Sequence, residues 1–312
     1  MKKGRIFTNC LFIVCTLMAA ISFTSCSADS DSSYSGIDES VIKNADSQTE
    51  APFSVVLKAY SDNKDITVKG DVDQTTLFVF DQNGDYYTQV SLDKTYLLQA
   101  KPVEISCPGS KQITVVAWAG LSSDSENISA MSKANIISDL QVSLKQNNGV
   151  AAALPGDLFY GQITLKNTAT KAGVKTLKIE RKVSSISLIT KGVIKMLDSR
   201  EGNFYYKVKK TKASFDHNGK LTGEEIEYII PATMDAKDNV VADNTAILPA
   251  SDVTIELYKD DNMILSSKNV KNLEKVSVNE GEQSEITFDL SKNNCNIVVA
   301  DWGTVITHVT IG

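Results

Sequence analysis

The sequence is poor in the residues from which active sites and metal centres are usually built. Its 312 residues include two histidines, His217 and His308, and neither has a cysteine or carboxylate neighbour at metal-ligand spacing. No serine stands in a nucleophile-elbow setting, and no glycine-rich loop joins a predicted strand to a predicted helix. The sequence therefore predicts no catalytic residue, no metal site and no cofactor, and it predicts that the chain is not an enzyme.

Clusters of positive charge are also missing. The chain has 32 lysines and arginines against 38 aspartates and glutamates, which gives a formal net charge of −6. Polyanions are bound mainly through lysine and arginine side chains. The composition therefore argues against nucleic acid, and against a bare anionic lipid surface, as partners.

The N-terminal apolar run is too short to cross a membrane. It extends from about residue 10 to residue 21, whereas a bilayer-spanning helix needs about 20 apolar residues. Lys2, Lys3 and Arg5 precede it, and small or polar residues follow it. This order is typical of a secretory signal peptide, which we predict over residues 1–25.

Cys26 stands where cleavage of that signal is expected. The peptide Phe23-Thr24-Ser25-Cys26 resembles a bacterial lipobox, which implies that lipid is attached to the Cys26 thiol and holds the mature chain in the outer membrane. An ordinary signal peptide with an incidental cysteine is the alternative. Residues 26–50 are rich in serine and acidic residues and almost free of apolar ones, so we predict a flexible leash.

Few cysteines remain for a disulfide. Cys10 and Cys15 belong to the predicted signal, so Cys107 and Cys295 are the two left in the folded part. A disulfide between them is possible in an oxidising envelope. Because they lie far apart in the sequence, we favour two buried free thiols.

From Pro52 onward the hydrophobic pattern has a period of two, which predicts half-buried strands. Asn83-Gly84 predicts a type I′ hairpin turn, and the mixed spacing of apolar residues over 127–140 favours a short helix. The strands predicted in the first half are 53–59, 75–80, 86–92, 113–119, 177–180 and 183–190.

A second set of short, β-branched or aromatic segments follows Lys191-Gly192. These segments are separated by turn residues, as in β-sandwiches, and the peptide at 80–84 recurs in similar form at 215–219. The sequence predicts an all-β fold with two tandem β-sandwich domains, 51–191 and 192–312, in whose cores Trp118 and Trp302 pack. The strands predicted in the second half are 203–209, 225–230, 253–258, 276–278, 285–290, 296–300 and 305–311.

Several of these features together resemble the fimbrillin superfamily, and most of all the minor fimbrial anchor subunits of Bacteroidales. They are the lipobox, the acidic leash, the strand before the Asn-Gly turn, the peptide Gly-Asp-Leu-Phe-Tyr-Gly at 156–161 and the peptide Ile-Glu-Arg-Lys-Val-Ser-Ser-Ile at 179–186. The resemblance implies two transthyretin-like β-sandwiches and assembly by exchange of β-strands. It also implies fimbrial stalk subunits as partners and a surface-exposed location at the fimbrium base.

Two segments are candidates for strand exchange. If the chain is not processed, Phe53, Val55 and Leu57 stay in the groove of their own first domain. The uncharged C-terminal stretch, with Val305, Thr307, Val309 and Ile311 alternating along it, is either the last strand of its own domain or a strand donated to a stalk subunit. The alternatives to an anchor are a polymerising or tip fimbrillin and a surface glycan-binding lipoprotein.

Overall fold

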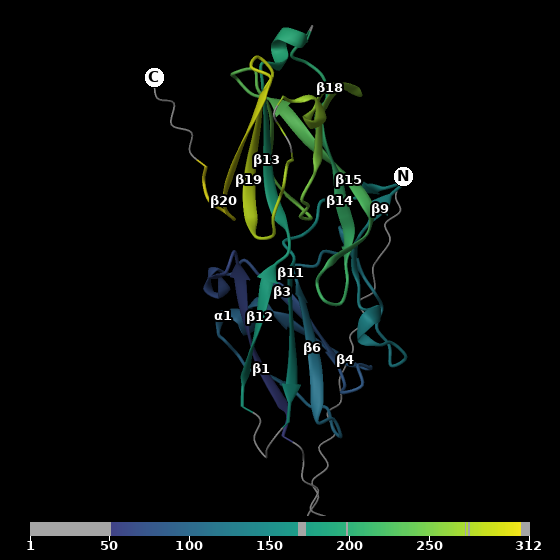
Figure 1. Cartoon of the computed structure of the whole chain (residues 1–312). Coiled ribbons are helices and arrows are strands. Elements are labelled where there is room, and N and C mark those ends of the chain that lie inside the picture. Colours follow the sequence, from purple (N-terminus) through teal and green to yellow (C-terminus); the bar gives the residue numbers. More distant parts are fainter. Residues whose placement is uncertain (1–50, 168–172, 198, 272, 274, 307–312) are drawn as a thin grey trace, which may run out of the picture. The chain divides into compact units, whose positions relative to one another are not determined.

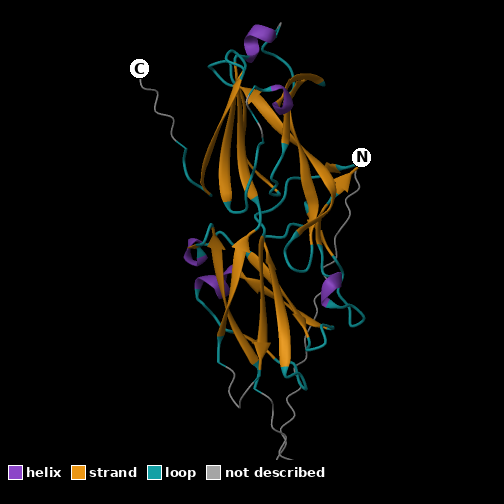
Figure 2. Ribbon diagram, viewed as in Figure 1, coloured by secondary structure: helices purple, strands orange, loops and turns teal. Residues whose placement is uncertain are grey.

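The structure, a computed structural model, describes residues 51–167, 173–197, 199–271, 273 and 275–306 (Figure 1). All of them belong to one compact unit, Thr49–Gly312. They form two β-sheets with a few short helices, which confirms the predicted all-β class (Figure 2). The predicted signal peptide, Cys26 and the leash lie outside the described residues. Among the described residues, no helix has the length and hydropathy needed to cross a membrane.

The first sheet has the strand order β2-β1-β12-β11-β6-β3-β4, and β5 also pairs with β1. β1 runs parallel to β12, and the other neighbours are antiparallel. A helix, α1 (Lys94–Leu98), follows β4. The strands are β1 (Phe53–Ser61), β2 (Lys64–Asp65), β3 (Gln74–Phe80), β4 (Tyr86–Asp93), β5 (Val103–Ile105), β6 (Gln112–Ala119), β11 (Phe159–Lys166) and β12 (Lys175–Arg181).

β3 is buried on both faces. Leu77 and Val79 pack into the core under the first sheet, whereas Phe78 and Phe80 pack into a core that includes the second sheet. β6 divides its side chains in the same way, with Val116 and Trp118 in the second core. Burial on two sides explains why these strands are continuous apolar runs rather than strict alternations.

The second sheet has the order β18-β17-β14-β15-β16-β13-β19-β20, and the short strands β7 to β10 join it at β14 and β15. β15 is long: its residues up to Ala232 pair with β14, and Thr233 and Met234 pair with β16. It therefore connects two layers that enclose one core. The strands are β7 (Glu126–Ile128), β8 (Val142–Leu144), β9 (Gln146–Asn147), β10 (Val150–Ala151), β13 (Ser184–Lys191), β14 (Phe204–Phe215), β15 (Leu221–Met234), β16 (Val240–Ile247), β17 (Thr254–Lys259), β18 (Asn262–Ser266), β19 (Glu282–Asp289) and β20 (Asn294–Asp301). Short 3-10 helices lie at Thr67–Lys69, Ile137–Asp139, Val193–Met196 and Ser267–Asn269.

The sheet to which a strand belongs does not follow sequence order. β13 comes two residues after β12 but pairs with β16 and β19 of the second sheet, whereas its position within the predicted first domain indicates the first sheet. The predicted helix over 127–140 is wrong: the segment contains the end of β7 and one 3-10 turn, and Ile128 and Ile136 are exposed, so its apolar residues share no buried face. The predicted division at residue 191 stays a prediction.

The turn after β3 is a hairpin, but its type differs from the prediction. A type I′ turn needs positive φ at both central residues, and at Asn83-Gly84 only Gly84 has it, with φ 85°. The Asp81 carboxylate accepts hydrogen bonds from the backbone N–H groups of Asn83 (2.8 Å) and Asp85 (3.0 Å). Asp216 repeats these bonds with Asn218 and Lys220. The two similar peptides therefore form the same aspartate-stabilised turn.

Candidate strand-exchange site

The predicted N-terminal exchange residues lie inside the core of the first sheet. Phe53, Val55 and Leu57 are 2%, 0% and 0% exposed. Their strand, β1, pairs with β12 from Val55–Lys175 to Tyr60–Glu180 (Figure 1). Full burial of such a side chain contributes about 1.5–3 kcal/mol, so β1 is an integral part of the core of the first sheet.

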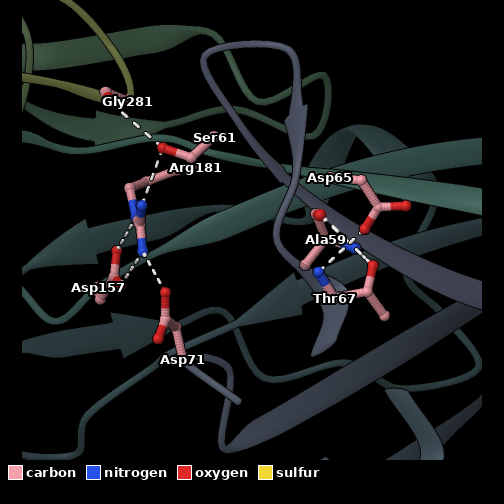
Figure 3. A network of polar contacts seen from close by, with 8 residues as sticks. All are labelled: Ala59, Ser61, Asp65, Thr67, Asp71, Asp157, Arg181 and Gly281. Carbon is pink, nitrogen blue, oxygen red and sulfur yellow. Dashed lines mark hydrogen bonds and ion pairs between the residues drawn. The ribbon is translucent and has the colours of Figure 1, made fainter. Parts of the chain in front are cut away.

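The outer edge of β1 is closed along most of its length. β5 pairs with it at one end and β2 at the other. Between them, the Ala59 N–H donates to the Thr67 hydroxyl (3.0 Å) (Figure 3). The Ile66 N–H donates to the Ala59 carbonyl (2.8 Å). A covered edge cannot pair with another chain.

Asp65 holds this cover in place. Its carboxylate accepts hydrogen bonds from the Thr67 N–H (3.0 Å) and from Lys58 Nζ (3.1 Å). Hydrogen bonds from Thr67, and then the one from Lys58, lower the pKa of the Asp65 carboxyl to about 2. The ionised carboxylate is thus part of what closes the β1 edge.

Arg181, at the end of β12, ties the end of β1 to both sheets (Figure 3). Its side chain is only 2% exposed. Nε and Nη2 donate to the two carboxylate oxygens of Asp157 at 2.7 and 2.8 Å, a bidentate geometry. Nη1 donates to the Ser61 hydroxyl (2.8 Å), which donates in turn to the Gly281 carbonyl (3.2 Å) just before β19. A further carboxylate, that of Asp71, lies 3.6 Å from Nη2.

Two aromatic rings flank the same guanidinium. Its central carbon lies 4.9 Å from the ring centroid of Phe159 and 4.4 Å from that of Trp302. Both distances are within the range of cation–π attraction. Trp302 directly follows β20, so Arg181 also fixes the point at which the C-terminal segment leaves the second sheet.

The peptide at 156–161 is a packing motif. A Cβ atom on Gly161 would lie 2.0 Å from the Lys178 carbonyl oxygen, so only glycine allows β11 and β12 to approach this closely. The Gly156 N–H donates to Glu126 (2.9 Å), and burial raises the pKa of that carboxyl. The Tyr160 hydroxyl donates to the His217 carbonyl (3.0 Å) in the second half. The motif therefore joins the two sheets and contains no reactive group.

The C-terminal candidates are placed only in part. Val305 is 86% exposed and belongs to no strand, and Thr307, Val309 and Ile311 lie outside the described residues. After β20 the chain turns, with the Thr304 N–H donating to the Asp301 carbonyl (3.1 Å). Residues 303–306 line a cavity of about 360 Å³ with strands β13, β16 and β19.

The remaining candidates of the sequence analysis are structural. Trp118 is fully buried, as predicted, and Trp302 is half-buried. Cys107 and Cys295 are both free thiols; Cys107 is buried, but Cys295 is only half-buried, and burial raises its pKa to about 11. Within the described part of the chain, no group of histidine, cysteine and acidic side chains is arranged to hold a metal.

The fold is that of fimbrial and adhesin-like proteins of the Bacteroidales. One similar structure is that of a Bacteroides thetaiotaomicron protein proposed to bind polysaccharide, with a TM-score of 0.64 and 19% identity over 83% of this chain and 99% of that one. Another is the fimbrial anchor protein Mfa2 of Porphyromonas gingivalis, with a TM-score of 0.57 and 16% identity over 80% and 98% of the two chains. At these identities the comparison shows the fold alone.

The sequence defines the family. The profile of the fimbrillin-A associated anchor proteins Mfa1 and Mfa2 matches residues 46–308, and the chain belongs to this family. The major fimbrium anchoring subunit FimB of Porphyromonas gingivalis is 28% identical over 162 residues, which are 51% of this chain and 52% of FimB. The match thus spans about half the length of this curated relative. Membership in a family of structural fimbrial proteins agrees with the prediction that the chain is not an enzyme.

Proposed function

We propose that the protein anchors fimbriae at the cell surface, held in the outer membrane by lipid on Cys26. Membership in the anchor family and the similarity to FimB support this role. The fimbrial stalk subunits of the same superfamily are the proposed partners, and the fimbrium base is the proposed location.

The seating of β1 is the observation that carries the proposal. A polymerising subunit must open a groove by losing its first strand, whereas here β1 fills the groove with Phe53, Val55 and Leu57 and its outer edge is closed. Arg181, the first arginine after Arg5, is buried. Lys58 lies within the paired strand and bonds to Asp65, so a trypsin-like protease reaches it only after β1 has left the sheet.

The C-terminal segment completes the proposed mechanism. In an anchor that keeps β1, the first-sheet groove accepts no strand, but the uncharged segment after Trp302 can be donated to the last stalk subunit through backbone hydrogen bonds. A chain that donates a strand but keeps its own first-sheet groove filled both attaches the fibre and ends it. Val305, Thr307, Val309 and Ile311 are the residues proposed to enter the groove of the stalk subunit.

The glycan-binding alternative predicts exposed aromatic platforms. Trp118 is buried and Trp302 stacks on Arg181. The half-buried Tyr205 and Tyr258 stack on each other, with ring centroids 5.2 Å apart and planes at 1°, and Lys207 lies over Tyr258. Stacking covers one face of each ring and Lys207 lies over Tyr258, so this pair leaves a sugar little ring face beyond the second face of Tyr205. We take this limited aromatic surface to favour the anchor over a glycan-binding protein.

Replacement of the proposed lipid attachment site tests the function. We expect Cys26→Ser to move the protein from the membrane fraction to the soluble fraction and to release intact fimbriae into the medium. Cys107→Ser is the matched control, because that thiol is buried in the folded part. Undiminished membrane retention of Cys26→Ser, with fimbriae still attached, would contradict the proposal.

A further inference from the structure

Strand β20 ends the second sheet and has an open side. In the described part of the chain it pairs only with β19, over eight positions from Asn294–Asp289 to Asp301–Glu282 (Figure 1). The backbone groups on its other side have no strand partner there. Such an edge can accept a further strand.

The core-facing side chains of β20 are only partly covered. Cys295, Ile297 and Val299 point to the same side as Phe288, Ile286 and Ser284, their partners on β19. Those three β19 residues are 0%, 0% and 2% exposed, whereas Cys295 and Ile297 are half-buried and Val299 is 51% exposed. An apolar row that begins in the core thus reaches solvent at the edge of the sheet.

The edge also lacks the devices that usually block strand addition. Residues 294–300 carry no formal charge and no proline, and Asp301 is the one charged residue of the strand. β1, by contrast, has its edge closed by β5, Thr67 and β2. Among the described residues, the edge of β1 is thus covered and that of β20 is not.

The open edge is held in position at its C-terminal end. Asp301 forms an ion pair with Lys64 of β2, and the next residue, Trp302, stacks on Arg181. A strand that is already fixed loses less entropy when a partner pairs with it. The proposed donor segment begins directly after this point, so a stalk subunit that receives it is brought beside β20.

We propose that β20 is a docking edge for an extended segment of a fimbrial partner subunit. The segment that fits is about seven residues long, is uncharged, and has apolar side chains at alternate positions that cover the row of Cys295, Ile297 and Val299. This inference rests on the proposed anchoring function and adds a second contact to the donated C-terminal strand.

Site-specific cross-linking on cells tests the location of the contact. Val299→Cys is made in a Cys295→Ser background and labelled with a maleimide–diazirine probe; Val68→Cys, at a position 80% exposed on the first half, is the control. We expect light-induced adducts with a fimbrial subunit at least tenfold more abundant from position 299 than from position 68. No adduct, equal yields, or an adduct with a second copy of this chain alone would overturn the proposal.

A pair of proline variants tests whether the contact is strand addition. In adjacent residues of a strand the N–H groups point to opposite sides, so of Val298→Pro and Val299→Pro one removes a bond to β19 and the other removes an outward donor. We expect the variant that keeps the wild-type thermal midpoint to retain at most one tenth of the wild-type amount of attached fimbriae. If this variant retains the wild-type amount of attached fimbriae, strand addition at β20 is excluded. That result does not contradict the anchoring function, which Cys26→Ser tests separately.

Discussion

The guanidinium of Arg181 stacks on the indole of Trp302, with its central carbon 4.4 Å from the ring centroid. This contact joins the last residue of β12 to the first residue after β20. The same guanidinium bonds to Ser61 at the end of β1 and to Asp157 before β11. One buried side chain thus connects the N-terminal strand, both sheets and the start of the C-terminal segment.

Removal of the Arg181 charge should be strongly destabilising. Arg181→Met leaves the Asp157 carboxylate without its bidentate partner. Loss of one member of a fully buried ion pair costs about 3–5 kcal/mol; because Asp157 is 31% exposed, we expect a loss near the lower end, about 3 kcal/mol. Chemical denaturation measures the loss. Arg200→Met is the control, because its pair with Asp238 is exposed and should be worth less than about 1 kcal/mol. Equal losses in the two variants would show that the Arg181 contacts are not special.

Truncation of a β1 core residue should loosen the N-terminal strand. Leu57→Ala creates a cavity in the first core and should cost about 2–5 kcal/mol. We also expect faster tryptic cleavage after Lys58, since that bond becomes accessible when β1 leaves the sheet. Val68→Ala, at an exposed position, should stay within about 0.5 kcal/mol of wild type. Unchanged cleavage in Leu57→Ala would speak against a β1 that opens as a unit.

Deletion of residues 51–59 should promote the formation of oligomers. The deletion exposes the edge of β12 and the apolar groove that Phe53, Val55 and Leu57 fill, and open edges pair between chains. Light scattering after size exclusion measures the mass, and a peptide covering β1, added in trans, should restore the monomer. A deletion variant that remains a stable monomer without the peptide would contradict the proposed groove.

Acid should loosen the cover on β1. The folded-state pKa of Asp65, about 2, lies below its ordinary value of 3.8, so its contribution to stability is fully present above about pH 4 and is lost as the pH falls toward 2. We expect amide exchange at Ala59 and Thr67, corrected for the intrinsic rate, to speed up in that window. Asp65→Asn should exchange faster at neutral pH and lose the acid response. The same response in both proteins would assign the transition to another group.

A charge in the C-terminal segment should distinguish donation of the segment to a stalk subunit from packing of the segment within its own domain. Val309→Asp places a carboxylate where the proposed donor strand enters the groove of the stalk subunit, so we expect co-purification of the stalk subunit to fall at least tenfold with no change in the thermal midpoint. Val68→Asp, at an exposed position outside the proposed donor segment, is the matched charge control and should change neither the binding nor the midpoint. If Val309→Asp lowers the thermal midpoint as well as the binding, the segment packs in the core of its own domain and is not donated.

Local patterns in the sequence predict most of the long strands but not their partners. β16 and β18 are not predicted, and the predicted strand 276–278 contributes only the isolated bridge of Val278 with Ala250. The alternation of Phe53, Val55 and Leu57 correctly indicates a half-buried strand, yet its parallel pairing with β12, more than 100 residues away, leaves no local signal. β11 was missed because its short motif gives no clear alternation: Gly161 has no side chain and serves only to let β12 approach. β13 was assigned to the wrong sheet because two residues suffice for the chain to cross between sheets.

The sequence predicts the two motifs that meet at Arg181 but not the contact between them. Asp157 and Arg181 stand in the two peptides that carry the family resemblance, but their bond depends on the pairing of β11 with β12. A third copy of the aspartate turn, at Asp235–Asn239, was also missed, since Asp238, with φ 63°, takes the position that glycine holds in the other two. Aspartate tolerates this conformation, so a search for Asn-Gly alone overlooks it.

The direction of β1 has a mechanical consequence. Its Ser61 end meets Gly281 and Arg181 at the second sheet, so its Phe53 end, where the chain enters the fold, points away from that sheet. Tension between a membrane tether and a fibre held by the C-terminal half would run along the axis of β1. The parallel ladder from Val55 to Tyr60 would then be loaded in shear, with its hydrogen bonds strained together rather than opened one after another. In a chain pulled by the flow around a fibre, this geometry resists extraction of the strand better than a ladder that unzips from one end.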